Sequence, residues 1–141
     1  MNAASTLLPV TVESFAKLAG FIKAAQTCMF TTVTTDGSLH SRPLLTREVD
    51  VAGHALWFFA VSNFSKVGVI LDEKPVALSY AAAEGQGYVS VSGRAHVVHD
   101  KAKTEELWTP MAATRFPKGV DDPRLILLRV DVEAVEYWDS P

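Results

Sequence analysis

The sequence has little of what marks several large classes of protein. Its one cysteine, Cys28, excludes an intrachain disulfide, and the apolar stretch around it predicts a buried, unreactive thiol. No block of like charges occurs and the formal net charge is −3, so neither nucleic acid nor an anionic membrane is expected as the main partner. The longest apolar run, residues 55–61, is too short to span a bilayer, and residues 1–10 lack the basic start of a signal peptide. These absences predict a cytoplasmic protein without disulfides.

Recognisable catalytic motifs are missing as well. Gly85-Gln86-Gly87 begins like a dinucleotide-binding fingerprint, but it precedes a predicted strand instead of a helix, which favours a hairpin turn. His96 and His99 stand three residues apart on a predicted strand, so their side chains point to opposite faces and cannot chelate one ion together. The sequence therefore predicts no metal site, and it identifies no catalytic residue.

What is present is enough apolar material for one core. The chain has 141 residues, of which 48% are hydrophobic, and no composition shift divides it, which predicts a single domain over residues 1–141. Apolar spacing predicts helices at 12–25 and 101–108, the second capped by Asp100. Strand patterns, with a hairpin turn at Asp36-Gly37, cover residues 29–35, 39–49, 55–61, 76–82, 88–99, 125–132 and 134–138. Six or seven mostly antiparallel strands with flanking helices predict a mainly-β fold, a β-barrel.

The segment around Arg42 is unusual for a core strand. In a regular strand His40, Arg42, Leu44 and Thr46 share one face. Pro43 has no N–H and is tolerated only where the ladder needs no donor, which means an edge, a bulge or a ligand-lined break in the barrel. On the residues alone, a surface arginine on an edge strand and a ligand-binding arginine both remain open.

A second basic group and a set of aromatic residues extend this hypothesis. Lys66 lies near the hydroxyls of Ser62 and Ser65 and a predicted helix start, which suits a phosphate, although a lone lysine is usually only solvated. Six aromatic residues could form the walls of a flat slot for a planar heterocycle, with Ser90 and Ser92 as polar partners. The alternative interpretation is that they pack in the core. These residues are Trp57, Phe58, Phe59, Tyr88, Trp108 and Trp138.

Taken in order, these segments resemble the FMN-binding split barrels of the pyridoxamine 5′-phosphate oxidase-like superfamily, and most closely its general stress protein branch. The resemblance extends from about Phe15 to Trp138. It depends on residues 32–37, 39–43, 56–59, 66, 89–93, 107–110, 116–117 and 136–139. It implies a homodimer with FMN at the subunit interface.

The resemblance also implies roles for particular residues. Arg42 and Lys66 would grip the FMN phosphate, and the backbone of Pro43, Leu44 and Leu45 would run along the isoalloxazine ring. Phe59 and Ala60 stand where the family often has an aromatic residue followed by Thr, so Ser62 or Ser65 would supply the missing hydroxyl. Tyr88 stands where the oxidases carry a Gln toward the flavin. Trp108 and Phe116 would cover the cofactor from the partner subunit.

Several functions are compatible with this resemblance. The first is a flavin-dependent oxidoreductase of the general stress protein type, with FAD able to replace FMN if the cavity mouth is open. The second is a pyridoxamine 5′-phosphate oxidase, against which counts the absence, after Asp139, of the oxidases' C-terminal Arg and His for the substrate. The third is a non-catalytic flavin carrier or sensor, and the fourth is a barrel that binds another planar cofactor, such as haem or deazaflavin.

Overall fold

The computed structural model describes residues 4–9, 12–62, 74–84 and 87–139. The strands are β1 (Ala4–Pro9), β2 (Thr27–Val33), β3 (Leu39–Asp50), β4 (Ala55–Val61), β5 (Lys74–Ala81), β6 (Tyr88–Val98) and β7 (Leu125–Asp139). The helices are α1 (Val12–Ala25) and α2 (Lys101–Leu107), with the 3-10 helices η2 (Pro110–Thr114) and η3 (Gly119–Asp121). The bounds of α1 and β4 are those predicted from the sequence.

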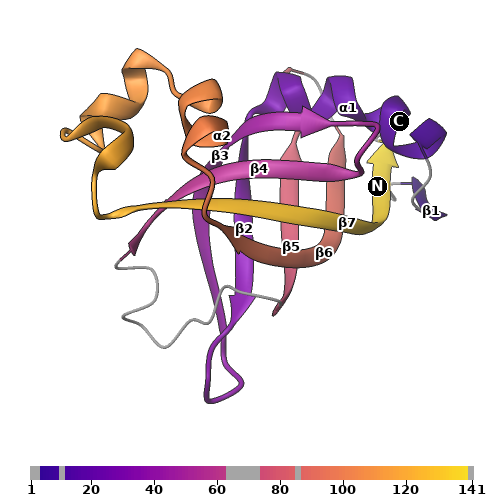
Figure 1. Ribbon diagram of the computed structural model, residues 1–141. Helices are drawn as coiled ribbons and strands as arrows, with labels where there is room; N and C mark the ends of the chain where they lie inside the picture. The colour runs from indigo at the N-terminus through magenta and orange to yellow at the C-terminus, as the bar shows by residue number, and fades with distance from the viewer. Residues whose placement is uncertain (1–3, 10–11, 63–73, 85–86, 140–141) are drawn as a thin grey trace.

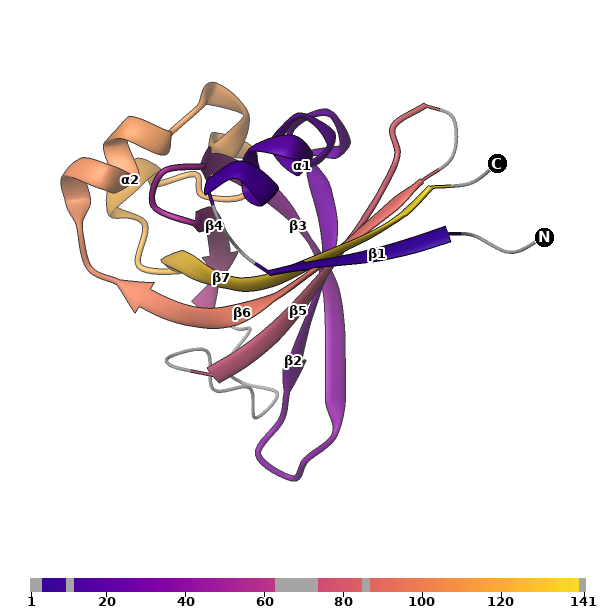
Figure 2. The same cartoon turned by 90° about the vertical axis from the view of Figure 1, so that its right-hand side faces the viewer.

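The strands form a closed antiparallel barrel. Six of them follow the order β7-β4-β3-β2-β5-β6, and the pairing of β6 with β7 closes the ring. Strand β7 is long enough to pair with β4 through residues 125–131 and with β1 through residues 134–139 on the same edge. Figures 1 and 2 show the strongly twisted sheet that results and β1 lying alongside β7. The predicted mainly-β barrel with flanking helices is confirmed.

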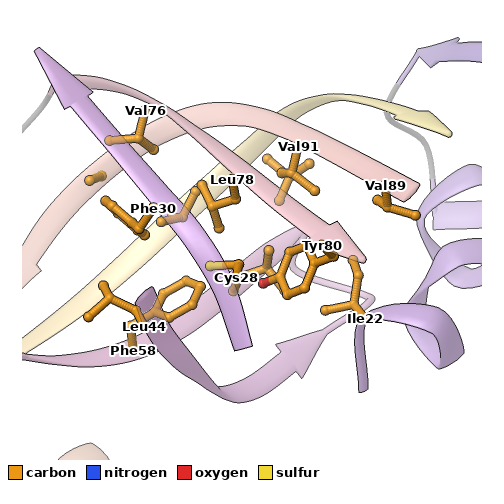
Figure 3. Packing of buried hydrophobic residues seen from close by; sticks show 14 of the residues in the cluster. Ile22, Cys28, Phe30, Leu44, Phe58, Val76, Leu78, Tyr80, Val89 and Val91 are labelled. Atoms are coloured by element: carbon orange, nitrogen blue, oxygen red, sulfur yellow. The ribbon is translucent and has the colours of Figure 1, made fainter. Parts of the chain in front are cut away.

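The barrel interior is filled by large apolar side chains. Helix α1 lies over one end of the barrel (Figure 1) and buries the stripe that its spacing predicts, including Phe15 and Ile22. Strands β2, β4 and β5 contribute Phe30, Phe58 and Leu78, all 0% exposed, and Figure 3 shows how they interlock. This continuous apolar interior is the main source of stability.

A second, smaller cluster lies on the outside of the barrel. Side chains alternate along a strand, so Trp57 and Phe59 point away from the interior that Phe58 enters. They pack under α2 and η2 against Leu107 and Phe116. Strand β4 is therefore buried on both faces, as its sequence predicts.

Near the two chain ends the structure differs from the sequence analysis, by one corrected prediction and one strand that was not predicted. The two predicted strands 125–132 and 134–138 are one strand, β7, because a β-bulge at Glu133 absorbs the irregularity without ending the ladder. Opposite the bulge lies Gly93, where an added Cβ would come within 2.2 Å of the Asp131 carbonyl oxygen. Strand β1 was not predicted, because a short segment without clear alternation acquires its strand character from pairing with β7.

Two further sequence predictions concern residues 62–71 and the bilayer. The loop and short helix predicted over residues 62–71 fall almost entirely outside the described residues. None of the helices in the described part of the chain has the length and apolar character that crossing a bilayer requires.

Candidate functional site

The barrel opens between β3 and β4. Among the described residues, these strands pair from Thr46 and Phe58 to Asp50 and Ala55, whereas the earlier half of β3 pairs only with β2 and the end of β4 only with β7. A cavity of about 410 Å³ lies in this split, within the size range of small-molecule sites. Its lining is His40, Ser41, Arg42, Pro43, Leu44, Leu45, Arg47, Phe59, Ala60, Val61, Arg115 and Phe116.

The split brings together most of the residues singled out in the sequence. Arg42, Pro43, Leu44 and Leu45 line the cavity from β3, while Phe59 and Ala60 line it from β4. Pro43 therefore stands where β3 has a partner on one edge only, which fits a residue without an N–H. The neighbouring Arg42 lines a ligand-sized cavity and is half-buried, so it does not lie on a fully exposed strand edge.

The cavity is basic. Three guanidinium groups line it, and no Asp or Glu belongs to its lining among the described residues. Burial and the nearby charge of Arg115 lower the pKa of Arg42 and of Arg47 below the usual value, although both stay protonated at neutral pH. A nitrogen of Arg42 also lies 3.4 Å from Nε2 of His40. This arrangement favours an anion and repels a cation.

Arg47 was not identified from the sequence, and its position has a specific cause. Between the pairs Thr46–Phe58 and Glu48–Trp57 the β3–β4 register shifts, leaving Arg47 as the extra residue of a β-bulge. Its guanidinium carbon lies 4.8 Å from the ring centre of Phe59, a cation–π contact. A regular-strand assumption misplaces this side chain, because face assignments change at a bulge.

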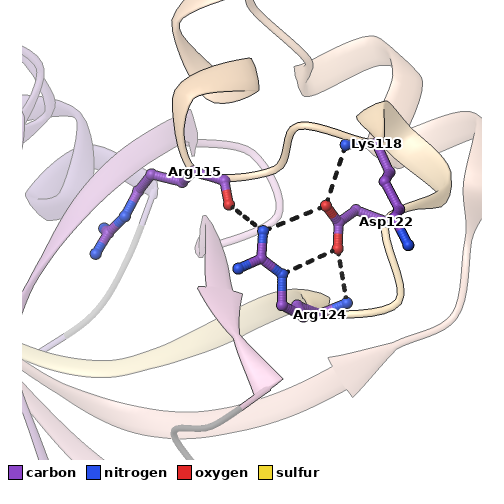
Figure 4. Close-up of polar contacts among 4 residues, drawn as sticks. All are labelled: Arg115, Lys118, Asp122 and Arg124. Carbon is purple, nitrogen blue, oxygen red and sulfur yellow. Dashed lines mark hydrogen bonds and ion pairs between the residues drawn. The ribbon is translucent and has the colours of Figure 1, made fainter.

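Arg115 was also missed, and no local pattern in the sequence indicates its role. It caps η2 and reaches the cavity from the segment after α2. The buried carboxylate of Asp122 pairs with Arg124 at 3.3 Å, and a guanidinium nitrogen of Arg124 donates to the Arg115 carbonyl at 2.8 Å. The backbone N–H groups of Lys118 and Arg124 also donate to Asp122, at 3.2 and 3.0 Å. We call Asp122 and Arg124 the clasp. In Figure 4 the Arg115 guanidinium points away from it.

Strand alternation separates the aromatic residues considered as walls of one slot, and Phe58 and Phe59 take the core-packing alternative in two different clusters. Phe58 lies inside the barrel, whereas Phe59 contacts Trp108 and Phe116 outside it, with ring centres 6.2 Å apart in both pairs. Trp108 and Phe116 thus pack on Phe59 of their own chain.

The remaining site candidates lie elsewhere. Tyr88, with Trp138 and Ser90, lines another cavity of about 630 Å³ on the outer face of the sheet. Ser65 and Lys66 lie outside the described residues.

From Thr46, which follows the cavity residue Leu45 in β3, a chain of hydrogen bonds enters the core. The Tyr80 hydroxyl bonds to Oγ1 of Thr46 at 2.7 Å and to the thiol of Cys28. Burial raises the pKa of Cys28 to about 12 and that of Tyr80 above its usual value. Cys28 is thus the buried thiol that its sequence context predicts.

The histidines do not form a metal site. His96 pairs with Asp131 at 2.8 Å on the outside of the barrel. Over the described ranges, no three His, Cys, Asp or Glu side chains gather closely enough to hold an ion.

Fold and cavity together define the class of an antiparallel split barrel with a basic ligand cavity beside β3. The sequence profile described as pyridoxamine 5′-phosphate oxidase-like matches residues 13–141, and the chain belongs to this family. Among the curated proteins, none matches the chain significantly.

Solved structures share the fold over almost the whole chain. The general stress FMN/FAD binding protein of Xanthomonas citri is 26% identical, with a TM-score of 0.76 over 93% of this chain and 93% of that one. General stress protein 26 of Bacillus anthracis is 19% identical, with a TM-score of 0.74 over 92% of this chain and 96% of that one. A protein related to general stress protein 26 from Clostridium acetobutylicum is also 19% identical, with a TM-score of 0.75 over 91% of this chain and 89% of that one. At this identity the last two show the fold alone.

Proposed function

We propose that this protein is a flavoprotein of the general stress protein type that holds FMN in the cavity between β3 and β4. The observation that carries the proposal is the concentration of guanidinium groups in a cavity without a described carboxylate. A phosphate monoester carries roughly −1.5 to −2 charges at neutral pH, and guanidinium groups bind it through paired, charge-assisted hydrogen bonds. The similarity to the Xanthomonas citri FMN/FAD binding protein supports a flavin as the ligand.

The lining fits such a ligand in its polar and apolar parts. Arg42 would hold the phosphate, with Lys66 as the second cation that the family resemblance implies. The edge of β3 at Pro43 to Leu45 faces the split and would lie along the ring system, where a main-chain N–H directed away from β2 can bond to a ring heteroatom. The bound flavin would supply hydride or electron transfer, while the chain would bind it, orient it and limit its contact with water. The proposed activity is accordingly that of a flavin-dependent oxidoreductase.

We extend the proposal to a homodimer that covers the outer sheet face. Tyr88 and Met29 on this face are 57% and 45% exposed, and they line the outer cavity together with Trp138. Clustered apolar exposure of this kind is typical of interaction surfaces. Light scattering after gel filtration should give the mass of a dimer. Tyr88→Glu should reduce this mass, whereas Leu39→Glu, at the distant hairpin, should leave it unchanged.

The cytoplasmic location expected from the sequence belongs to the proposal too, and cell fractionation tests it.

Titration with FMN tests the central claim. The absorbance spectrum of the purified protein identifies the cofactor first, since flavin, haem and deazaflavin absorb differently. FMN affinity is then measured for the wild type, Arg42→Ala, Lys66→Ala and the control Arg94→Ala, whose exposed side chain pairs with Glu133 on the barrel exterior. We expect Arg42→Ala to weaken FMN by roughly tenfold or more, the loss of one charge-assisted contact. Unchanged affinity in both Arg42→Ala and Lys66→Ala would reject the assigned phosphate site.

Turnover assays separate the remaining functions. Oxidation of a nicotinamide donor with quinone or oxygen as acceptor would support the oxidoreductase. Oxygen-dependent formation of pyridoxal phosphate would instead favour the oxidase alternative. Tight flavin binding without any turnover would indicate a carrier or sensor.

A further inference from the structure

The split holds more positive charge than one phosphate needs. If Arg42 binds the flavin phosphate, as proposed above, Arg47 and Arg115 remain at the same cavity. Neither of them forms an ion pair with any described residue. With no described carboxylate in the lining, the like charges of Arg47 and Arg115 raise the free energy of the empty cavity, and a bound anion would offset that cost.

Arg47 is held in place and still has capacity to bind. The face of Phe59 supports its guanidinium at 4.8 Å, and Nη1 donates to the Thr109 hydroxyl at 3.3 Å. Its Nε is buried and has no hydrogen-bond partner among the described residues. A buried donor without a partner is costly, so a ligand oxygen at this position would be favourable.

Arg47 also marks where the cavity continues. It lines both the cavity of the split and an adjoining groove of about 860 Å³ between α1, β3 and η2. The other charged residues of the groove are Lys23 and Glu48, and the Glu48 carboxylate is already paired with Lys103 at 2.7 Å. Arg47 and Leu45 are the residues common to both linings, so a ligand that extends from the split into the groove would run beside the Arg47 guanidinium.

Arg115 reaches the cavity from the C-terminal end of η2, whereas Arg42 and Arg47 belong to β3. The clasp holds its backbone carbonyl, which leaves the guanidinium directed away from Asp122 (Figure 4). Its charge is close enough to lower the pKa of both Arg42 and Arg47. Arg115 is exposed, so it can meet a ligand without first being uncovered.

We propose that Arg47 and Arg115 form a second oxyanion subsite beside Arg42, which binds a phosphate or carboxylate group in addition to the flavin phosphate. This inference rests on the proposed function, because it assigns the first phosphate to Arg42. The second oxyanion has two sources, the second phosphate of FAD or the anionic group of a separate small molecule in the groove. Both present the same chemistry to two guanidinium groups.

Two titrations test the subsite and distinguish its sources. FMN and FAD are titrated into flavin-free protein, and inorganic phosphate is titrated into FMN-loaded protein with the flavin absorbance as readout. The variants are Arg47→Gln and Arg115→Gln, with Arg94→Gln as the matched loss of a positive charge outside both cavities. We expect each cavity variant to lower the affinity for the second oxyanion by roughly tenfold, through the loss of one charge-assisted hydrogen bond. The affinity for FMN should fall by a clearly smaller factor.

Each pattern of results decides the matter. FAD binding tighter than FMN in the wild type, with the advantage lost in both variants, identifies the second phosphate of FAD as the occupant. Equal FAD and FMN affinities with a phosphate-dependent absorbance change, lost in both variants, identify a separate anion. The subsite is rejected if both variants weaken FMN as much as Arg42→Gln does, because the arginines then serve the first phosphate. The subsite is also rejected if Arg47→Gln and Arg115→Gln bind both FAD and phosphate with the same affinity as Arg94→Gln.

Failure of the proposed function gives a different result. If no flavin binds, phosphate can still be added to the flavin-free protein while the unfolding temperature is measured. A rise that Arg47→Gln and Arg115→Gln both diminish and Arg94→Gln retains would preserve the oxyanion subsite and reject only the flavin. No rise in the wild type would reject both.

Discussion

Strand β3 contributes to two regions of opposite character. Leu44 borders the cavity but packs into the apolar core and is 5% exposed, whereas Arg42, two residues earlier on the same face, is half-buried and belongs to the basic cavity alone. The difference follows from the ladder. Residues 39–45 of β3 pair with β2 alone, because β4 joins β3 only from Thr46 onward, and this unpaired edge leaves room for charge beside Arg42. Stability and binding chemistry therefore occupy separable places on one strand.

Truncating the interior should produce the largest effect. Leu78 is 0% exposed inside the barrel, and Leu78→Ala should lower the free energy of unfolding by about 2–5 kcal/mol, through lost burial and the cavity left behind. Urea denaturation measures the change. The matched control is Leu39→Ala, because Leu39 is 74% exposed and should cost much less. Equal costs at both positions would contradict the division between interior and surface.

Loss of the clasp should have the next largest effect, and it should depend on pH. Backbone and side-chain hydrogen bonds from Arg124 lower the pKa of Asp122 below its usual value near 3.8. The folded pKa is thus below the unfolded one, so the stabilisation is present above pH of about 4 and is lost as the pH falls through the lowered pKa. Asp122→Asn should lower the unfolding temperature at neutral pH and flatten its acid dependence.

The neighbouring carboxylate provides the control for this prediction. Asp121 is largely exposed and pairs with Lys101 at 3.3 Å on the surface. Thermal unfolding of Asp121→Asn between neutral and acid pH should follow the wild type closely. If both variants behave alike, the clasp has no special role in holding the Arg115 segment.

Removing the Tyr80 hydroxyl tests the boundary between the two regions. Tyr80→Phe removes the bonds to Thr46 and Cys28, and should cost about 1 kcal/mol of unfolding free energy. Tyr88→Phe removes an exposed hydroxyl and should change little. Labelling of Cys28 with a thiol reagent provides a second measurement, since its pKa of about 12 predicts reaction only after unfolding. Fast labelling of the native wild type would contradict the sealed core.

Removing a positive charge from the cavity should have the smallest effect on the free energy of unfolding, and it should raise that free energy instead of lowering it. Arg115→Gln relieves repulsion with Arg42 and Arg47, so the flavin-free protein should become more stable by roughly 0.5 kcal/mol or less. Because the cavity charges are partly solvated, the gain should fade at high salt. Denaturation at two ionic strengths measures it, and Arg94→Gln, which loses a pairing with Glu133, should show no gain.

Much of the fold was open to prediction because its signals are local. Apolar spacing determined α1, Asp100 marks the start of α2 through its bond to the Lys103 N–H, and Asp36-Gly37 marks the β2–β3 turn. Helix periodicity, capping and turn chemistry each depend on a few neighbouring residues, so they can be read without knowing what packs against them. Pro43 next to Arg42 indicated an edge, a bulge or a ligand-lined break, and strand pairing decided among them, because β3 has a partner on one edge only at Pro43.

Tertiary structure decided what depends on contacts between distant segments. Strand β1 exists through pairing with β7, and the bulge at Glu133 keeps β7 whole, neither of which a local pattern contains. Arg115 is 73 positions from Arg42 in the chain, the difference of their residue numbers, and reaches the same cavity because of how η2 is held. The sequence by itself thus determined most of the helices and strands and the position of Arg42 on a strand. The position of the split and the convergence of three guanidinium groups were decided by strand pairing, because charge density in a cavity is a property of the folded arrangement.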